Sequence, residues 1–303
     1  MRPTHLAALL LLALIWGSSF MLIKVMLEEM TPAAIGWSRL GGGAALILAL
    51  SAARRPALPR SFTHWRDVTA VALVSGALPL FLIPWGEQQI PSNLAAILNG
   101  AVPIWTVVLA VMFLPAEPMT PVRMAGVALG FVGLAVVIGP DALNVREAST
   151  QGQLAVVLAT LGYAAGSVIT RRRLQDADST LLAGSQSLIA FAMLLPFVVA
   201  AGDVPDFAAL SGRVLMATAA LTFMSQGVAM IIYFWLLKNV EATQVVLVTY
   251  LAPVAAIGWG WLVLDERLEL ALIPGLVLIL AGMMLANRRP RPAPAAVPAT
   301  IEA

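Results

Sequence analysis

Ten apolar stretches, separated by short polar gaps, follow one another along almost the whole of this 303-residue chain. Each has close to the ~20 residues that a helix needs to cross the hydrocarbon core of a bilayer. Only 11% of the residues are charged, whereas about a quarter are charged in soluble domains. The sequence therefore predicts an all-α membrane protein with ten transmembrane helices and no soluble domain. The predicted spans are residues 5–27, 32–52, 67–86, 93–114, 121–139, 153–170, 180–201, 213–237, 243–264 and 270–287.

The second half of the chain repeats the first. A shift of 150 residues sets Pro103 on Pro253, and past the fourth span a shift of 149 sets Glu117 on Glu266. Two halves with an odd number of spans insert with opposite orientation, as in secondary transporters whose substrate site lies between the repeats. We predict two inverted five-helix repeats, 1–145 and 150–287, around a central cavity. Residues 288–303, rich in Arg, Pro and Ala, are predicted to be a disordered cytoplasmic tail.

Basic residues indicate the orientation, because cytoplasmic loops collect Lys and Arg. With the N-terminus inside, the outer side receives only Lys24, Arg146, Arg213 and Arg267, and Arg39 lies within a span. Both termini are therefore predicted to be cytoplasmic. The basic residues on the inner side are Arg2, Arg54, Arg55, Arg60, Arg66, Arg123, Arg171, Arg172, Arg173, Lys238, Arg288, Arg289 and Arg291.

The sequence lacks the common signatures of catalysis. It has no Gly-x-x-x-x-Gly-Lys phosphate loop, no cysteine and only two histidines, His5 and His64, outside any His-Glu-x-x-His arrangement. We therefore expect no enzymatic activity, no metal site, no cofactor and no nucleic-acid partner. The triplet at 41–43, Gly-Gly-Gly, superficially resembles a phosphate cradle, but in an apolar helix it indicates close helix packing.

Polar side chains recur at helical spacing within three spans, and inside lipid such groups face a cavity or another helix. The cavity interpretation predicts a substrate site, whereas the alternative is hydrogen bonding between helices. The stripes contain Thr222, Ser225, Gln226 and Tyr233; Thr160, Tyr163 and Ser167; and Asn99, Pro103 and Thr106. The candidate substrate-binding residues are Asn99, Tyr163, Ser167, Ser225, Gln226, Thr249, Trp16, Ser19 and Arg39.

Prolines within spans free backbone carbonyls and kink helices. Pro79, Pro103 and Pro253 are the candidate hinges, and Pro103 and Pro253 occupy matched positions in the two halves. Ordinary tolerance of proline in membrane helices is the alternative.

The fifth and tenth spans are rich in glycine and almost free of polar side chains. They are predicted to be packing helices at the periphery. The Gly126-x-x-x-Gly130 pair is expected to pack within a monomer, with dimerisation as the alternative.

Charged residues within the spans are few. Arg39 lies seven residues from Pro32, about 10 Å deep at 1.5 Å per residue. It is expected to reach outward, to pair with Glu87 or Glu28, or to hold a substrate carboxylate. The acidic residues stand at predicted span ends, which favours uncoupled facilitation or substrate exchange over proton coupling.

The order of these features resembles the ten-helix branch of the drug/metabolite transporter superfamily, up to about residue 287. The resemblance rests on the opening from Ala13 to Phe20, the second span from Pro32 to Leu40, the matched segments ending at Pro103 and Pro253, and Glu117 or Glu266 before a Gly-rich last span. It implies a cavity lined by spans one, three, four, six, eight and nine, with five and ten outside. The first half departs by placing Pro115 and Ala116 before Glu117, so the Asp265 and Glu266 pair is assigned no catalytic role.

Members similar to this chain export amino acids, including aromatic ones, from bacteria, and others carry nucleosides, other metabolites or drugs. We expect a multi-pass protein of the bacterial inner membrane that exports neutral or aromatic amino acids by alternating access. Its expected partners are a small-molecule substrate and lipid. Efflux of drugs or nucleosides is the runner-up, and a non-transporting scaffold or receptor is the contrary hypothesis. The aromatic residues that suit such a substrate are Trp16, Trp85, Trp105, Tyr163 and Tyr250.

Overall fold

The computed structural model describes residues 2–54, 58–59, 61–114, 119–139, 147–240, 242–245 and 247–287. Glu117, Arg55, Arg60, Arg146 and the predicted tail at 288–303 lie outside the described residues. In the part that is described, all regular structure is helical and no strand occurs. Every predicted span coincides with a helical stretch.

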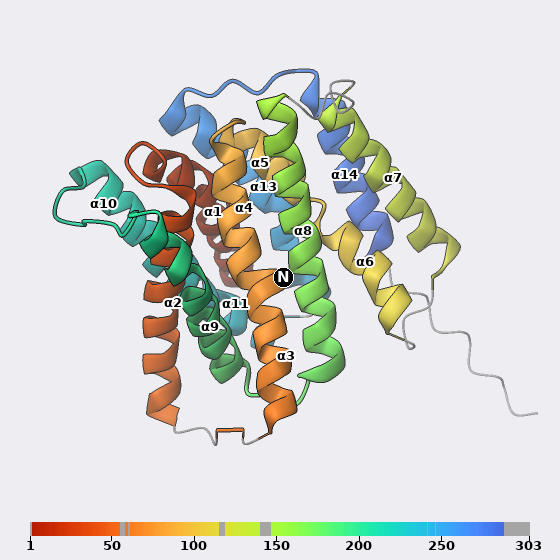
Figure 1. Cartoon of the computed structure of the whole chain (residues 1–303). Helices are drawn as coiled ribbons and strands as arrows, with labels where there is room; N and C mark the ends of the chain where they lie inside the picture. Colours follow the sequence, from red (N-terminus) through yellow and green to blue (C-terminus); the bar gives the residue numbers. More distant parts are fainter. Residues whose placement is uncertain are drawn as a thin grey trace, which may run out of the picture.

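The described residues of the first half form five helical stretches, of which two are divided, and Figure 1 shows their arrangement. The third consists of α3, the π-helical segment η1 and α4 in unbroken succession, and the fourth consists of α5 and α6. These elements are α1 (Pro3–Met26), α2 (Pro32–Arg54), α3 (Phe62–Ala72), η1 (Leu73–Ala77), α4 (Leu78–Glu87), α5 (Ser92–Asn99), α6 (Val102–Phe113) and α7 (Pro121–Ile138).

The second half follows a similar plan. Its third stretch again contains a π-helical segment, η3, between two α-helices. The elements are α8 (Ala148–Arg173), α9 (Ser179–Ala200), α10 (Gly212–Ala219), η3 (Ala220–Val228), α11 (Ala229–Asn239), α12 (Ala242–Val245), α13 (Leu247–Leu264) and α14 (Leu272–Ala286).

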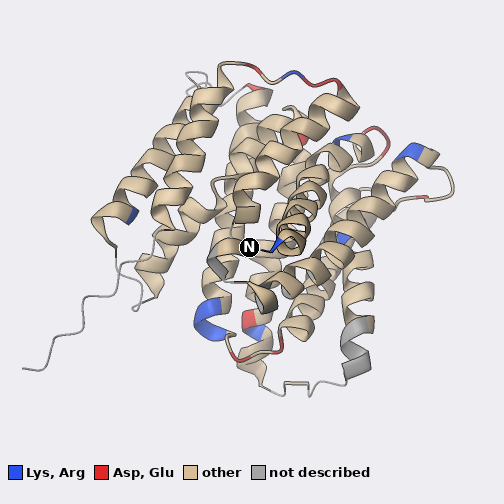
Figure 2. Ribbon diagram, turned by 180° about the vertical axis from the view of Figure 1, so that it is seen from behind, with Lys and Arg blue, Asp and Glu red and all other residues tan. Residues whose placement is uncertain are grey.

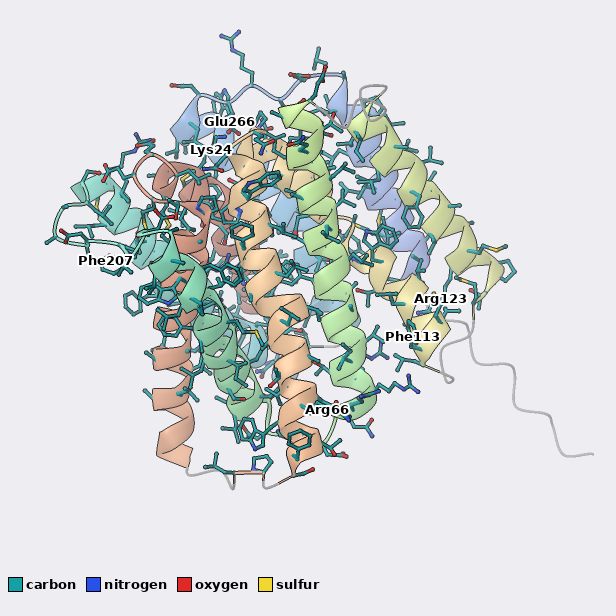
Figure 3. The ribbon with its side chains drawn as sticks, in the orientation of Figure 1. Lys24, Arg66, Phe113, Arg123, Phe207 and Glu266 are labelled. Carbon is teal, nitrogen blue, oxygen red and sulfur yellow. The ribbon has the colours of Figure 1, made fainter. Side chains whose placement is uncertain are left out.

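Eight helical stretches of the described residues are long and apolar enough to cross a membrane, and α14 is a shorter apolar helix. Figure 2 shows the charged residues gathered mostly at the two ends of the bundle and in its loops, while the helix bodies carry few charges. This distribution is typical of a multi-pass membrane protein. Arg66 lies at one end and Glu266 at the other (Figure 3), so these ends are called the Arg66 end and the Glu266 end.

The glycines of α7 and α14 bring the two helices into backbone contact at the edge of the bundle (Figure 1). A Cβ added to Gly133 would lie 2.7 Å from the backbone nitrogen of Ile279, and one added to Gly282 would lie 2.7 Å from the carbonyl oxygen of Gly126. Gly130 instead accommodates the side chain of Ile104 on α6. The glycines of the fifth and tenth spans are therefore used for packing within one chain.

The segment η1 ends just before Pro79, the second residue of α4. Proline has no backbone N–H, so the normal helical bond from position 79 to the carbonyl of Ser75 is lost. Ser75 also donates its hydroxyl to the carbonyl of Val71 at 3.0 Å. A missing bond together with a side chain inserted into the helical ladder is a recognised cause of such irregular turns.

Candidate functional site

Two of the predicted site residues, Ser19 on α1 and Ser225 on η3, meet across the two halves of the chain. Both are buried, and their hydroxyl oxygens lie 3.0 Å apart. One turn before Ser19, the ring of Trp16 packs against Tyr233 of α11 with 5.6 Å between the ring centroids. The eighth-span stripe and the predicted residues of the first span therefore share one interface.

The other members of the eighth-span stripe turn towards α2. Thr222 contacts Gly42, and a Cβ added to Gly43 would lie 3.2 Å from Cγ of Gln226. On the same helix, a Cβ on Gly41 would lie 2.7 Å from the ring of Phe191 on α9. The glycine triplet is thus a close-packing face, as the sequence indicates.

Asn99 is the last residue of α5, where the fourth helical stretch breaks. The chain turns at Gly100 and Ala101, and α6 then begins with Pro103 as its second residue. The side-chain oxygen of Asn99 is buried without a hydrogen-bond partner among the described residues. Thr106, by contrast, donates its hydroxyl to the carbonyl of Val102 at 2.8 Å, within its own helix.

Pro253 and Thr249 lie on α13, which remains helical through Pro253. Gly17 of α1 approaches this helix closely, since a Cβ on Gly17 would lie 2.7 Å from the carbonyl oxygen of Ala252. The two matched prolines thus differ: Pro103 follows a break, whereas Pro253 stands inside a helix. Thr249 is half-buried.

The α8 stripe divides. Tyr163 is half-buried, packs against the main apolar core and interacts electrostatically with Arg39 of α2. Thr160 is buried and donates to the carbonyl of Val157 at 2.6 Å, while Ser167 is exposed one turn beyond Tyr163. Ser167 is therefore not grouped with the others in this conformation.

Arg39 does not form either of the ion pairs expected from the sequence. Glu28 pairs instead with Arg213 at 3.1 Å, because the turn after α1 lies beside the start of α10. Among the described residues Arg39 has no ion pair with Glu87 either, although the two interact electrostatically, and Nε of Arg39 is buried without a partner. Tertiary packing, which the linear sequence does not show, decides these partners.

Charged side chains hold the turn between α4 and α5 at the Glu266 end (Figure 3). Lys24 of α1 donates its ammonium group to the carbonyl oxygens of Glu87 and, at 3.0 Å, Ile90. The carboxylate of Glu266 accepts from the backbone nitrogen and the hydroxyl of Ser92, each at 2.8 Å, and from the nitrogen of Asn93 at 3.1 Å. Both groups compensate the partial charges at helix ends.

Sequence reasoning did not assign Lys24 or Glu266 to this turn, and it placed Glu87 at a helix end without recognising its burial. Glu87 ends α4, as predicted, yet it is 0% exposed. A position at the end of an apolar stretch says where a helix stops, but not what packs over that end. The neighbouring glycine, Gly86, was the sequence feature that could have indicated this burial. A Cβ on Gly86 would lie 2.7 Å from the backbone of α8, so α8 packs closely against this end of α4.

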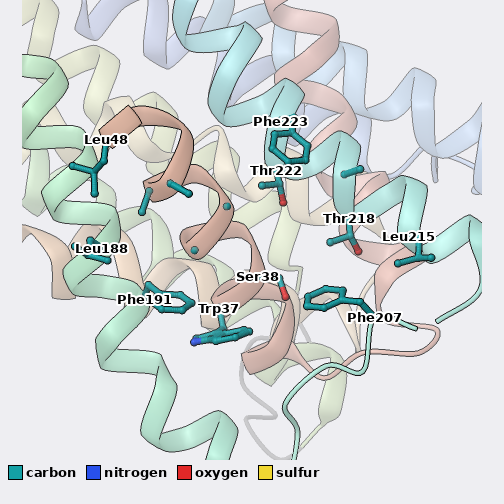
Figure 4. Close-up of a pocket in the computed structure, with 15 residues that line it drawn as sticks. Trp37, Ser38, Leu48, Leu188, Phe191, Phe207, Leu215, Thr218, Thr222 and Phe223 are labelled. Atoms are coloured by element: carbon teal, nitrogen blue, oxygen red, sulfur yellow. The ribbon is translucent and has the colours of Figure 1, made fainter. Parts of the chain in front are cut away.

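A cavity of about 590 Å³ lies between α2, α9, α10 and η3. Figure 4 shows that its wall includes the aromatic rings of Trp37, Phe191 and Phe207 and the hydroxyls of Ser38 and Thr218. Trp37 stacks on Phe191 with 4.7 Å between the ring centroids. None of the nine predicted substrate-binding residues lines this cavity, so it differs in place from the one that the sequence predicts.

The Arg66 end carries a separate ionic contact. Asp67 of α3 accepts from Arg66 at 3.0 Å and from Arg173 of α8 at 3.1 Å. The contact between Asp67 and Arg173 joins α3 to α8. Within those same residues, no group of three His, Cys, Asp or Glu side chains is arranged to hold a metal ion.

Comparison with known proteins gives consistent results. Residues 4–139 and 150–288 each match the profile of the EamA-like transporter family. A probable terminal-alkyne amino-acid exporter of Streptantibioticus cattleyicolor is 31% identical over 296 residues, which cover 93% of each chain. A probable amino-acid metabolite efflux pump of Escherichia coli is 25% identical over 91% of this chain and 92% of its own. The uncharacterised transporter YoaV of Bacillus subtilis is 25% identical over 90% of this chain and 92% of its own.

A solved crystal structure resembles the fold. It superposes with a TM-score of 0.63 and covers 95% of this chain and 97% of the other, at 18% sequence identity. At this identity the likeness concerns the fold alone.

Proposed function

Because the chain belongs to the EamA-like transporter family, within the drug/metabolite transporter superfamily, we propose that it exports neutral or aromatic amino acids across a bacterial inner membrane. The observation that carries the substrate class is that two relatives covering more than nine-tenths of the chain are named for amino-acid export. Transport proceeds by alternating access without ATP hydrolysis.

The proposed architecture is ten transmembrane helices in two inverted repeats, 1–145 and 150–287, with 288–303 as a cytoplasmic tail. The double match to one family profile supports it. Packing supports it as well, because the contact of α1 with α13 has a counterpart in that of α8 with α6. Likewise α2 contacts η3, and α9 contacts η1. These contacts exchange with one another when the two halves are exchanged.

The proposed orientation places both termini and the Arg66 end in the cytoplasm. The short connection between α8 and α9 follows three arginines, Arg171, Arg172 and Arg173. Arg66 stands at the same end (Figure 3), and α2, whose last residue is Arg54, also ends there (Figure 1). Lys and Arg concentrate on the cytoplasmic side of bacterial membrane proteins. The Glu266 end then faces the periplasm or exterior.

The proposed substrate site comprises the nine candidate residues and opens between α1, α2, α5, α8, η3 and α13. In the present conformation part of its polar surface is satisfied internally, as in the bond between Ser19 and Ser225. Opening exchanges that bond for contacts with substrate or water. Trp16 and Tyr233 supply an aromatic wall beside it, and Pro103 supplies a hinge at the break between α5 and α6.

Reconstitution tests this function. Liposomes containing the full chain should release preloaded labelled phenylalanine and leucine faster than protein-free liposomes, without nucleotide. Absence of flux for all twenty amino acids would refute the substrate class. Absence of flux for every solute tried would support a scaffold or receptor. Such a protein should also tolerate the substitutions Gln226→Leu and Tyr163→Leu.

Efflux of apolar drug-like molecules or nucleosides is the second candidate. The cavity of about 590 Å³ favours it, because drug-sized ligands bind in largely apolar pockets of about 300–1,000 Å³. In the same liposomes, flux of a hydrophobic dye or of uridine without amino-acid flux would select this alternative.

A further inference from the structure

The carboxyl group of Glu87 is the most completely enclosed acidic group among the described residues. Glu87 is 0% exposed, and both carboxyl oxygens are buried without a hydrogen-bond donor. It ends α4 at the turn that leads into α5, between elements from both halves of the chain. A buried polar group without a partner is rare enough in native proteins to require an explanation.

The neighbouring charges are arranged so that none of them pairs with this carboxyl. Lys24 of α1 directs its ammonium group to backbone carbonyls, including the carbonyl of Glu87 itself. Arg39 of α2 lies within electrostatic range but forms no ion pair among the described residues, and its Nε is buried without a partner there. Glu266, which follows α13, accepts hydrogen bonds with both carboxylate oxygens from the start of α5.

The remaining walls are close-packed and uncharged near the carboxyl. Gly86 abuts Gly152 and Val156 of α8. Tyr163, the titratable group of α8 in this region, interacts with Arg39, and the first turn of α5 contributes the uncharged Ser92 and Asn93. The site therefore excludes water and offers the carboxyl oxygens no donor.

An ionised carboxylate is very costly in such a site, whereas a neutral carboxylic acid is tolerated. If the start of α5 parts from Glu266, the carboxyl meets water while Lys24 and Arg39 remain near enough to favour its ionised form. We propose that Glu87 is a proton-exchange site that couples the opening of this end of the transporter to proton movement.

The step balances as a simple acid dissociation. On opening, the O–H bond of the Glu87 carboxylic acid breaks, the electron pair stays on the carboxylate, and the proton passes to water on the open side. On closing, the carboxylate takes a proton from hydronium on the open side, which becomes water, and is enclosed again as the neutral acid. No oxidant, metal or second reactant takes part. With Glu87 in this role, transport responds to protons, in contrast to the uncoupled transport expected from acids at span ends.

Infrared difference spectroscopy tests the site without any substrate. The full chain in lipid vesicles at neutral pH should show the carbonyl stretch of a protonated carboxylic acid, and Glu87→Gln should remove it. Glu269→Gln is the matched control, since Glu269 is an exposed acid in the loop before α14, and it should leave the band unchanged. Glu87→Asp should shift the band without removing it, which separates loss of the acid from loss of the fold. A band that survives in Glu87→Gln overturns the proposal.

Transport supplies a second test, which rests on the proposed function. With labelled phenylalanine as the probe, an imposed pH difference should change the rate in the wild type and in Glu269→Gln at least several-fold. Any flux left in Glu87→Gln should no longer respond to the pH difference, and a preserved response would overturn the proposal. If the wild type moves no phenylalanine at all, the proposed substrate class fails, and the infrared band still decides the role of Glu87.

Discussion

The hydroxyl oxygens of Ser19 and Ser225 lie 3.0 Å apart in the interior, although the two residues are 206 positions apart in the chain. The bond joins α1 of the first half to η3 of the second. Each hydroxyl was expected to face a substrate, and each has the other as its partner in this conformation. The contact therefore belongs to the closed interface between the halves and must be broken if a substrate is to pass there.

Replacing Ser225 with Ala should destabilise this conformation, because Ser19 would keep a buried hydroxyl without its partner. Such contacts in membrane proteins average ~0.6 kcal/mol, with a maximum of about 1.7. Thermal unfolding in detergent measures the effect, and Ser167→Ala, at an exposed position, is the control. The double variant Ser19→Ala with Ser225→Ala should recover part of the loss. Equal stability of Ser225→Ala and the wild type would show that the bond contributes nothing.

Replacing Gly133 with Ala should loosen the contact between α7 and α14. The added Cβ would lie 2.7 Å from the nitrogen of Ile279, and forcing extra atoms into a packed interface typically costs about 1–3 kcal/mol. Gly258→Ala is the matched control, since it lies within α13 and a Cβ there meets nothing within 4 Å. That variant should be neutral or slightly more stable, because Ala favours a helix over Gly. Similar melting temperatures for the two variants would contradict the close backbone contact between α7 and α14.

Acid should release the loop that precedes α10 from the turn that follows α1. Glu29 accepts hydrogen bonds from the hydroxyl and, at 2.8 Å, the backbone nitrogen of Ser211, and these bonds lower the pKa of its carboxyl from the ordinary 4.5. A lowered pKa means that the contact contributes fully above 4.5 and is lost as the pH falls through the folded value. The affected window therefore lies below pH 4.5.

A spin label can follow this release, since the chain has no cysteine of its own. A nitroxide on Ala209→Cys, at an exposed position in the loop, should become more mobile as the pH falls below 4.5. In a Glu29→Gln background the acid-induced change should be much smaller. If the mobility of the label does not depend on pH while Glu29 is present, the hydrogen bonds of Glu29 do not hold this loop.

Gln226→Leu and Tyr163→Ala should each reduce flux while the protein stays folded in the membrane. Removing a polar partner costs about 1–3 kcal/mol, which corresponds to roughly one to two powers of ten in affinity. Flux in liposomes at low substrate concentration measures the change. Val132→Leu is the control because Val132 is 53% exposed on α7, whereas the neighbouring Phe131 contacts Trp105 edge-on at 4.7 Å. Unchanged flux in both site variants would remove these residues from the pathway.

The helices could be predicted from the sequence because hydropathy and helix length have a direct physical cause in the bilayer. Pro103 and Gly100 likewise mark the break between α5 and α6, since one lacks a donor and the other lacks a side chain. The glycines at 41–43 indicated a packing face, and contacts with Phe191 and Thr222 confirm it.

The partners of individual polar groups could not be predicted in the same way. Thr222, Ser225 and Gln226 share a stripe, yet Ser225 turns to α1 while the other two turn to α2. The periodicity of one helix gives a face, but which neighbour covers that face depends on the packing of all the helices. For the same reason, the sequence does not indicate that Glu87 is buried, or that Lys24 and Glu266 bind the turn between α4 and α5.

The π segments η1 and η3 affect the register of the helices that contain them. In a π turn the hydrogen bond joins residues five apart instead of four. A π segment therefore uses more residues per turn than an α-helix does. An added residue in an α-helix rotates everything beyond it by ~100°, whereas a π turn absorbs the addition locally. The two segments overlap when the halves are aligned at a shift of 150 residues, which carries Leu73 to position 223 inside η3. Each half therefore carries this irregularity at a matched position of its third helical stretch.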